Sequence, residues 1–222
     1  MRCRLVGSEM CIRDSLVAAH VVGDIDIYVE DEEFGNGFRG SVDATIKTTN
    51  MGIELTLQAG KTIGNNPFRY FYFDGLLDLG DQLGIPLGAT GVALYGFGGG
   101  MWYNMNRSSQ FDSENPIMVD EFDGGGYNET PGATESGVVF TPQKGKVGFN
   151  ASVLFGIYQA RDVFNGDLEF GMQMDINDLS LDLVYMSGNG YVMQSPTGDR
   201  SPENSMIAAS VDIAVSYTHL TL

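Results

Sequence analysis

Acidic side chains form the densest group of residues in this chain that could do chemistry. Carboxylate oxygens are the ligands that Ca²⁺ prefers in proteins. The spacing of these acids does not follow the calcium-loop pattern, in which alternating acids precede a glycine and a distal glutamate. They are a candidate calcium site, and the sequence predicts no other cofactor. The candidate ligands are Asp112, Glu114, Asp120, Glu121 and Asp123, with a second acidic group at residues 24–33.

Aromatic side chains surround a glycine run at residues 96–100 and form a second candidate site. Tyr95, Phe97, Trp102 and Tyr103 could line a groove for a carbohydrate or a lipid, because aromatic rings offer large apolar contact areas. The glycines have a second explanation. They could let a strand bend while the aromatic rings pack over bare backbone.

Catalytic motifs are weak throughout the sequence. Ala59-Gly60-Lys61-Thr62 resembles the end of a phosphate-binding loop, but Leu55 stands where that motif requires its first glycine. A strand-end turn therefore explains the segment better. No spacing among the acids selects a pair for general acid–base work. We predict no catalytic residues and a protein that is not an enzyme.

Both ends of the chain resemble translated sequencing-library adapter. The inner part of the leader reads Met-Cys-Ile-Arg-Asp-Ser at residues 10–15, and residues 215–222 resemble the opposite adapter end. We expect residues 1–15 and 215–222 to be adapter-derived and residues 16–214 to be an internal piece of a longer protein. On this interpretation both cysteines and His219 carry no chemistry, and His20 is the interior's single histidine.

Composition narrows the classes of partner. The formal net charge is −17, so the chain repels phosphate backbones, and we expect no nucleic-acid partner. No run approaches the ~18 apolar residues that a spanning helix requires, so none is expected. The 30 glycines accompany many aromatic residues, a combination typical of β-sheet proteins rather than of disordered chains.

Apolar and polar residues alternate along much of the chain, and a period of two predicts strands with one buried face. Residues 68–79 are apolar at both parities and predict a central strand covered on both sides. The turn at residues 48–52 should use Asn50 and Gly52 at positive φ, and Asn165-Gly166 should form a hairpin turn. The alternating segments are residues 24–30, 41–47, 53–59, 147–157, 168–175 and 179–185, followed by a last strand from near Ser205.

Together these patterns predict an all-β fold. We expect antiparallel meanders that form an extended curved sheet, an open slice of a larger β protein. The expected divisions between the two adapter-like ends are a meander at 16–62, an aromatic and glycine-rich segment at 63–143 that includes a long acidic loop at 106–136, and a meander at 144–214.

The phrase Gly84-Ile85-Pro86-Leu87-Gly88, followed by the glycine-rich run at residues 94–100, resembles large β-rich proteins of bacterial envelopes. The resemblance implies a non-enzymatic structural or binding segment at the cell envelope or outside the cell. Its partners would be the remainder of its own parent chain and a carbohydrate or lipid ligand.

Two other functions stay open. The chain could be a fragment of an outer-membrane β-barrel, in which Phe149, Val153 and Phe155 would contact lipid. Acids close to the middle of several strands argue against this. It could also be a module that binds or degrades polysaccharide, which only unassigned carboxylates support.

Overall fold

The protein is built from one β-sheet. The computed structural model describes residues 10–15, 19–80, 82–107, 140–194 and 205–216, and every regular element within them is a strand. The strands are β1 (Met10–Ser15), β2 (Ala19–Asp31), β3 (Gly35–Ile46), β4 (Met51–Lys61), β5 (Arg69–Asp78), β6 (Ile85–Pro86), β7 (Val92–Arg107), β8 (Phe140–Ile157), β9 (Phe164–Asp175), β10 (Ser180–Val192) and β11 (Ile207–Ser216).

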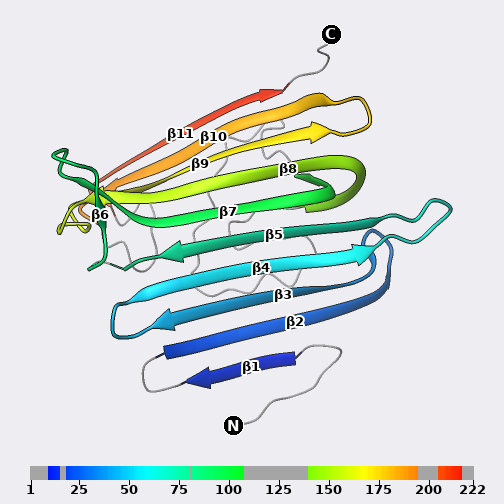
Figure 1. The fold of residues 1–222 in the computed structure, drawn as a ribbon, viewed down its shortest axis with the longest axis horizontal. Helices are drawn as coiled ribbons and strands as arrows, with labels where there is room; N and C mark the ends of the chain where they lie inside the picture. The colour runs from blue at the N-terminus through cyan, green and yellow to red at the C-terminus, as the bar shows by residue number, and fades with distance from the viewer. Residues whose placement is uncertain (1–9, 16–18, 81, 108–139, 195–204, 217–222) are drawn as a thin grey trace.

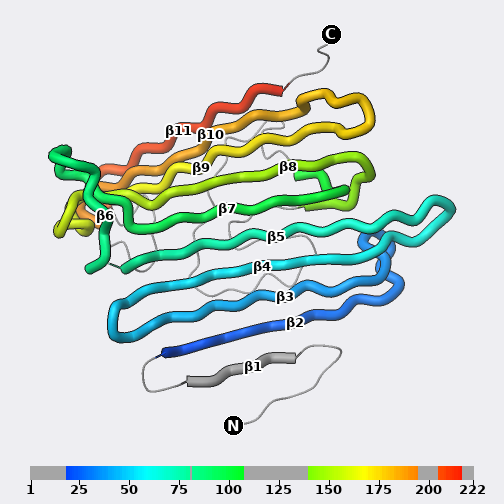
Figure 2. Tube along the Cα trace, in the orientation of Figure 1, coloured from blue at the N-terminus to red at the C-terminus, as the bar shows by residue number. Residues whose placement is uncertain are grey.

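Strands that follow one another in the chain also lie side by side in the sheet. The order is β1-β2-β3-β4-β5-β7-β8-β9-β10-β11, with the short β6 paired to β7, and every pairing is antiparallel. β1 and β11 form the two edges and lie on opposite sides of the open sheet (Figures 1 and 2). The prediction of an all-β, antiparallel, open sheet is confirmed.

The pairing register separates the side chains of the sheet into two faces. Leu57, Phe73, Met101 and Phe149 are direct cross-strand partners and therefore share one face, which we call the apolar face. The face is defined by its apolar positions, which on β2, β3, β4 and β5 are Val21, Gly23, Ile25, Ile27, Phe38, Gly40, Val42, Ala44, Ile53, Leu55, Ala59, Phe71, Gly75 and Leu77. Those on β7 to β11 are Phe97, Gly99, Tyr103, Val147, Ala151, Val153, Phe155, Gly166, Leu168, Phe170, Met172, Met174, Val184, Met186, Gly188, Gly190, Val192, Ala209, Val211, Ile213 and Val215. The same register continues at one end of β3, β4 and β5 into Asn36, Lys61 and Arg69.

The opposite face, which we call the polar face, holds the buried core. There Tyr72 and Phe140 stack with ring centroids 5.0 Å apart, and Trp102 lies 5.1 Å from Phe140. Trp102 packs directly on Gly148, where an added Cβ would come within 2.2 Å of the indole. Glycine is therefore required at position 148 so that the Trp102 ring can lie flat on the neighbouring strand. The glycine run at residues 96–100 differs from its expected environment, because the atoms nearest to an added Cβ there belong to backbone or to non-aromatic side chains.

β5 differs from its expected environment. Tyr70 and Tyr72 are buried on the polar face, but Phe73 on the apolar face remains 40% exposed. The prediction of a central strand was correct, and the prediction of cover on both sides was wrong. β5 is central within the plane of the sheet, which buries its backbone edges and leaves its second face open.

The turn predictions had mixed outcomes. Asn50 has a φ of 54° in the β3–β4 turn, as predicted, whereas Gly52 is already part of β4. The hairpin turn at Asn165-Gly166 was wrong, because both residues lie inside β9. Asn165 is buried there, and its amide donates to the carbonyls of Arg161 and Gln194 at 3.1 and 2.9 Å.

The three interior segments expected from composition join in one sheet. β8 begins at Phe140 and runs across the expected division at 143/144 without a break in the strand. The last expected strand is β11, all of whose residues are exposed at the sheet edge. β1 and the end of β11 fall in the adapter-like segments, whose origin remains a prediction.

Candidate functional site on the polar face

The centre of the polar face carries a cluster of ionisable side chains on β5, β7, β9 and β10. Asp74 of β5 lies on the same cross-strand row as Asn150 of β8 and Tyr185 of β10. Gly100 and Gly171 are the intervening members of that row. An added Cβ at Gly171 would lie 2.3 Å from the Tyr185 ring, so this ring covers the bare backbone of β9.

Glu169 accepts hydrogen bonds from two directions in this cluster. The hydroxyl of Tyr185 donates to its Oε1, and the guanidinium of Arg107 lies 3.5 Å from the same oxygen. The Arg107 guanidinium also stacks 3.9 Å from the centroid of the Tyr185 ring. The carboxylate is therefore held between a phenol and a cation.

The pKa of Asp74 differs from the usual value of an aspartate. Burial and the nearby charge of Glu169 raise the pKa of Asp74 to about 6, against weaker opposing effects from Asn150, Gly75 and Arg107. Burial and the charge of Glu169 also raise the pKa of the Tyr185 hydroxyl above its usual range. Asp74 therefore exchanges its proton near pH 6, well above the usual range of an aspartate, while Tyr185 keeps its proton and acts as a donor.

Gln173 fixes the end of β7 against β9. Its Oε1 accepts from the Trp102 indole at 3.1 Å and from the backbone amide of Arg107 at 3.0 Å. Its own amide donates to Asn106 Oδ1 at 2.7 Å. One buried side chain thus positions Arg107 over the cluster.

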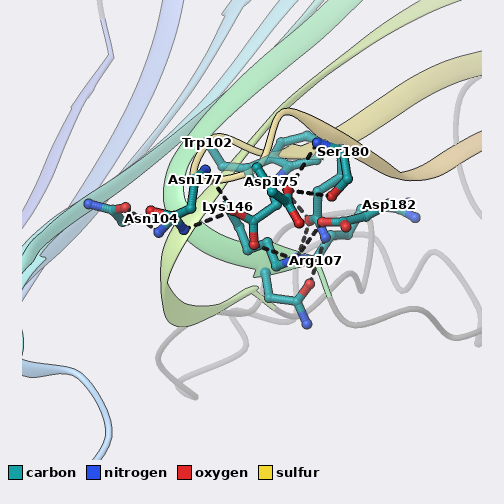
Figure 3. A network of polar contacts seen from close by, with 12 residues as sticks. Trp102, Asn104, Arg107, Lys146, Asp175, Asn177, Ser180 and Asp182 are labelled. Atoms are coloured by element: carbon teal, nitrogen blue, oxygen red, sulfur yellow. Dashed lines mark hydrogen bonds and ion pairs between the residues drawn. The ribbon is translucent and has the colours of Figure 1, made fainter. Parts of the chain in front are cut away.

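A second ionic group lies beside the first where β8, β9 and β10 meet (Figure 3). Lys146 Nζ lies 3.1 Å from Asp175 and 2.6 Å from Asp182. Although burial alone would lower the pKa of Lys146, these two carboxylates raise it. Nearby, Asn104 bridges β5 and β8 by accepting from the amide of Gly145 and donating to the carbonyl of Arg69, both at 2.8 Å.

A third group lies near the ends of β5 and β8. Arg161 is almost fully buried and forms a two-pronged ion pair with Asp78, with both N–O distances 3.0 Å. The same guanidinium lies 5.0 Å from the Tyr95 ring, whose hydroxyl donates to the carbonyl of Ile157 at 2.9 Å. This group joins the loop that follows β8 to β5 and β7.

The structure does not bring the four predicted aromatic residues into one groove. Tyr95 and Trp102 are buried on the polar face, whereas Phe97 and Tyr103 are on the apolar face and are each 39% exposed. Trp102 and Tyr103 separate because adjacent strand residues point to opposite faces. Tyr95 and Phe97 separate because the pairing of β7 with β8 shifts between Leu94 and Gly96.

The predicted calcium ligands lie outside the described residues. Within the part of the chain that the structure describes, no group of three or more His, Cys, Asp or Glu side chains is arranged to hold a metal ion. In that same part no helix has the length and hydropathy needed to cross a membrane.

Comparison of the chain with protein-family models, with curated proteins and with solved structures finds no match. The sequence-based search missed Arg107, Arg161, Glu169 and Tyr185. No local signal in the sequence marks them, because Arg107 and Glu169 are 62 residues apart and Arg161 and Asp78 are 83 apart.

Proposed function

We propose that the chain is a non-enzymatic structural segment of a bacterial envelope protein, whose sheet separates an apolar environment from an aqueous one. The observation that carries the proposal is the sorting of side chains between the two faces. Apart from Lys61 and Arg69 at one end of β4 and β5, the positions on β2 to β11 that are in register with the apolar face carry no charge, whereas the ionic clusters centred on Arg107, Lys146 and Arg161 all lie on the opposite side.

The contacts of the ionisable groups support a structural role. Arg107, Lys146 and Arg161 each join strands or loops that are distant in the sequence, through Glu169, Asp182 and Asp78. Glu169 is already engaged by a phenol and a guanidinium. These contacts use the Glu169 carboxylate to join β7, β9 and β10.

The separation of the predicted aromatic residues also favours this proposal over a polysaccharide module. A sugar-binding platform needs neighbouring rings that face one ligand. Here Trp102 contributes to the buried core, and Tyr103 points to the other side of the sheet. The envelope location rests on the sequence resemblance at residues 84–100.

The experiment is a hydrolysis assay paired with a stability measurement. We expect the full chain to release no reducing ends from a panel of polysaccharides. Glu169→Gln should lower the urea midpoint of unfolding, because it weakens the contact with Arg107. Asp212→Asn, which alters an exposed acid on β11, is the matched control and should leave the midpoint unchanged. Hydrolysis that is lost in Glu169→Gln and kept in Asp212→Asn would overturn the proposal.

A further inference from the structure

The apolar face is too large and too uniform for an ordinary water-exposed surface. From β2 to β11 the sheet is roughly 40 Å wide at ~4.8 Å per strand, which gives a face on the order of 1,000 Å². The largest apolar patch of a soluble monomer is roughly 300–600 Å². Phe73, Met101 and Phe149, in the middle of this face, are 40–47% exposed.

The composition of the face distinguishes between possible occupants. A folded protein partner normally forms about ten direct hydrogen bonds across an interface, supplied by polar groups around an apolar centre. Among the positions that define the apolar face, Tyr103 carries the only hydrogen-bonding side chain. Lipid hydrocarbon has no hydrogen-bond donors or acceptors, so it can cover such a face without polar partners.

The height of the face fits the same partner. The apolar positions of β8 run from Val147 to Phe155, which is about 27 Å along an extended strand. The outward apolar band of membrane proteins built from strands is about 25 Å tall. Lys61 and Arg69 are cross-strand partners at one end of β4 and β5, directly beyond the last apolar positions of these strands.

We infer that the apolar face contacts the hydrocarbon interior of a lipid bilayer, while the polar face lies away from lipid. This inference rests on the proposed structural function and names the apolar environment of that function. The acids near the middle of the strands are compatible with it, because register places them on the polar face, as for Asp74 and Glu169.

The test measures how the chain associates with vesicles of phosphatidylcholine, a neutral lipid that does not repel an acidic protein. The full chain is refolded from urea in the presence of the vesicles and is floated on a density gradient. We expect the folded chain to float with the lipid. Val211→Asp should reduce the floating fraction at least tenfold. Ser210→Asp, one residue away on the polar face of the same exposed strand, should float like the unaltered chain.

Fluorescence quenching reports which face contacts lipid. Trp102 is the chain's only tryptophan and is buried on the polar face, so vesicles of brominated phosphatidylcholine should leave its emission nearly unchanged. Phe149→Trp and Phe73→Trp each add a tryptophan to the apolar face, and the added emission should be strongly quenched.

Three results would overturn the inference. The first is a folded chain that does not float with the vesicles, and the second is equal flotation of Val211→Asp and Ser210→Asp. The third is a soluble dimer in which the Phe149→Trp emission is shielded without lipid, because that result would identify a second copy of the chain as the partner. Each would leave the structural proposal standing. Detection of hydrolysis dependent on Glu169 would instead remove the structural proposal itself.

Discussion

The two faces of this sheet differ in what their glycines contact and in whether they carry ion pairs. On the polar face, glycines lie beneath large rings, and ion pairs join strands that are far apart in the sequence. On the apolar face, Gly23, Gly40 and Gly190 leave room for a Cβ at ordinary contact distances, although Gly166 lies beneath the Phe155 ring, and no ion pair joins the positions that define this face. We therefore expect the polar face to determine the stability of the fold and the apolar face to determine which surroundings the sheet can contact. Substitutions on the polar face should therefore lower the free energy of unfolding in water more than substitutions on the apolar face.

The largest expected effect comes from the ion pair of Arg161. Arg161→Met removes both hydrogen bonds to Asp78 and leaves that carboxylate beside buried groups. Breaking a buried pair from one side typically costs about 3–5 kcal/mol. We expect a loss of about 3 kcal/mol in the free energy of unfolding, measured by urea denaturation.

Ile27→Thr on the apolar face is the matched comparison for Arg161→Met. This side chain is about half exposed, and threonine retains the β-branched shape that suits a strand. We expect a change of less than about 1 kcal/mol in water. Equal losses from the two substitutions would contradict the division of roles between the faces.

The second prediction concerns pH. The pKa of Asp74 is about 6 in the folded chain and 3.8 in the reference state. The folded state therefore binds more protons between these values, and stability falls as the pH rises from about 4 to about 6. The full shift corresponds to at most about 3 kcal/mol.

Asp74→Asn isolates this effect. The variant should lack the part of the pH dependence that belongs to Asp74, and it should be more stable than the unaltered chain above pH 6. Unfolding curves measured at pH 4, 5, 6 and 7 give the comparison. Parallel pH profiles for the two chains would show that Asp74 is not the group that titrates.

The third prediction compares glycines on the two faces. Gly148→Ala places a Cβ within 2.2 Å of the Trp102 ring, whereas Gly23→Ala on the apolar face meets nothing closer than 3.7 Å. Overpacking typically costs about 1–3 kcal/mol. We expect Gly148→Ala to lose about 2 kcal/mol and to shift the Trp102 emission.

Gly23→Ala should change stability by less than about 0.5 kcal/mol, because alanine fits there without displacing a neighbour and also restricts the unfolded chain. Thermal unfolding of both variants is the measurement. A large loss at Gly23 would show that the apolar face is packed more tightly than its contacts indicate.

The sequence predicted the part of the fold that depends on local alternation. Ile53, Leu55 and Leu57 share a face because the side chains of a strand repeat every second residue, and no tertiary information is needed for that. The same rule predicted the open antiparallel architecture. It could not predict which face would be covered, because both faces of β5 carry large apolar residues.

The ionic clusters on the polar face could not be predicted from local sequence patterns. Arg107 and Glu169 are 62 residues apart, and Arg161 and Asp78 are 83 apart. Their pairing depends on the register of several strands in succession. Asn165 misled the turn prediction for a related reason. Its local preference for a turn was overridden by two buried carbonyls that its amide satisfies.

The shift in pairing at Tyr95 has a consequence for how this sheet can change during evolution. Deleting or inserting one residue within a strand would move every following side chain to the wrong face, placing charges where hydrocarbon-like residues belong. A bulge absorbs such an event locally, as the extra residue between Leu94 and Gly96 does while Phe97 keeps its register. Related chains should therefore differ in strand length by even numbers of residues, and an odd difference should mark the position of a bulge.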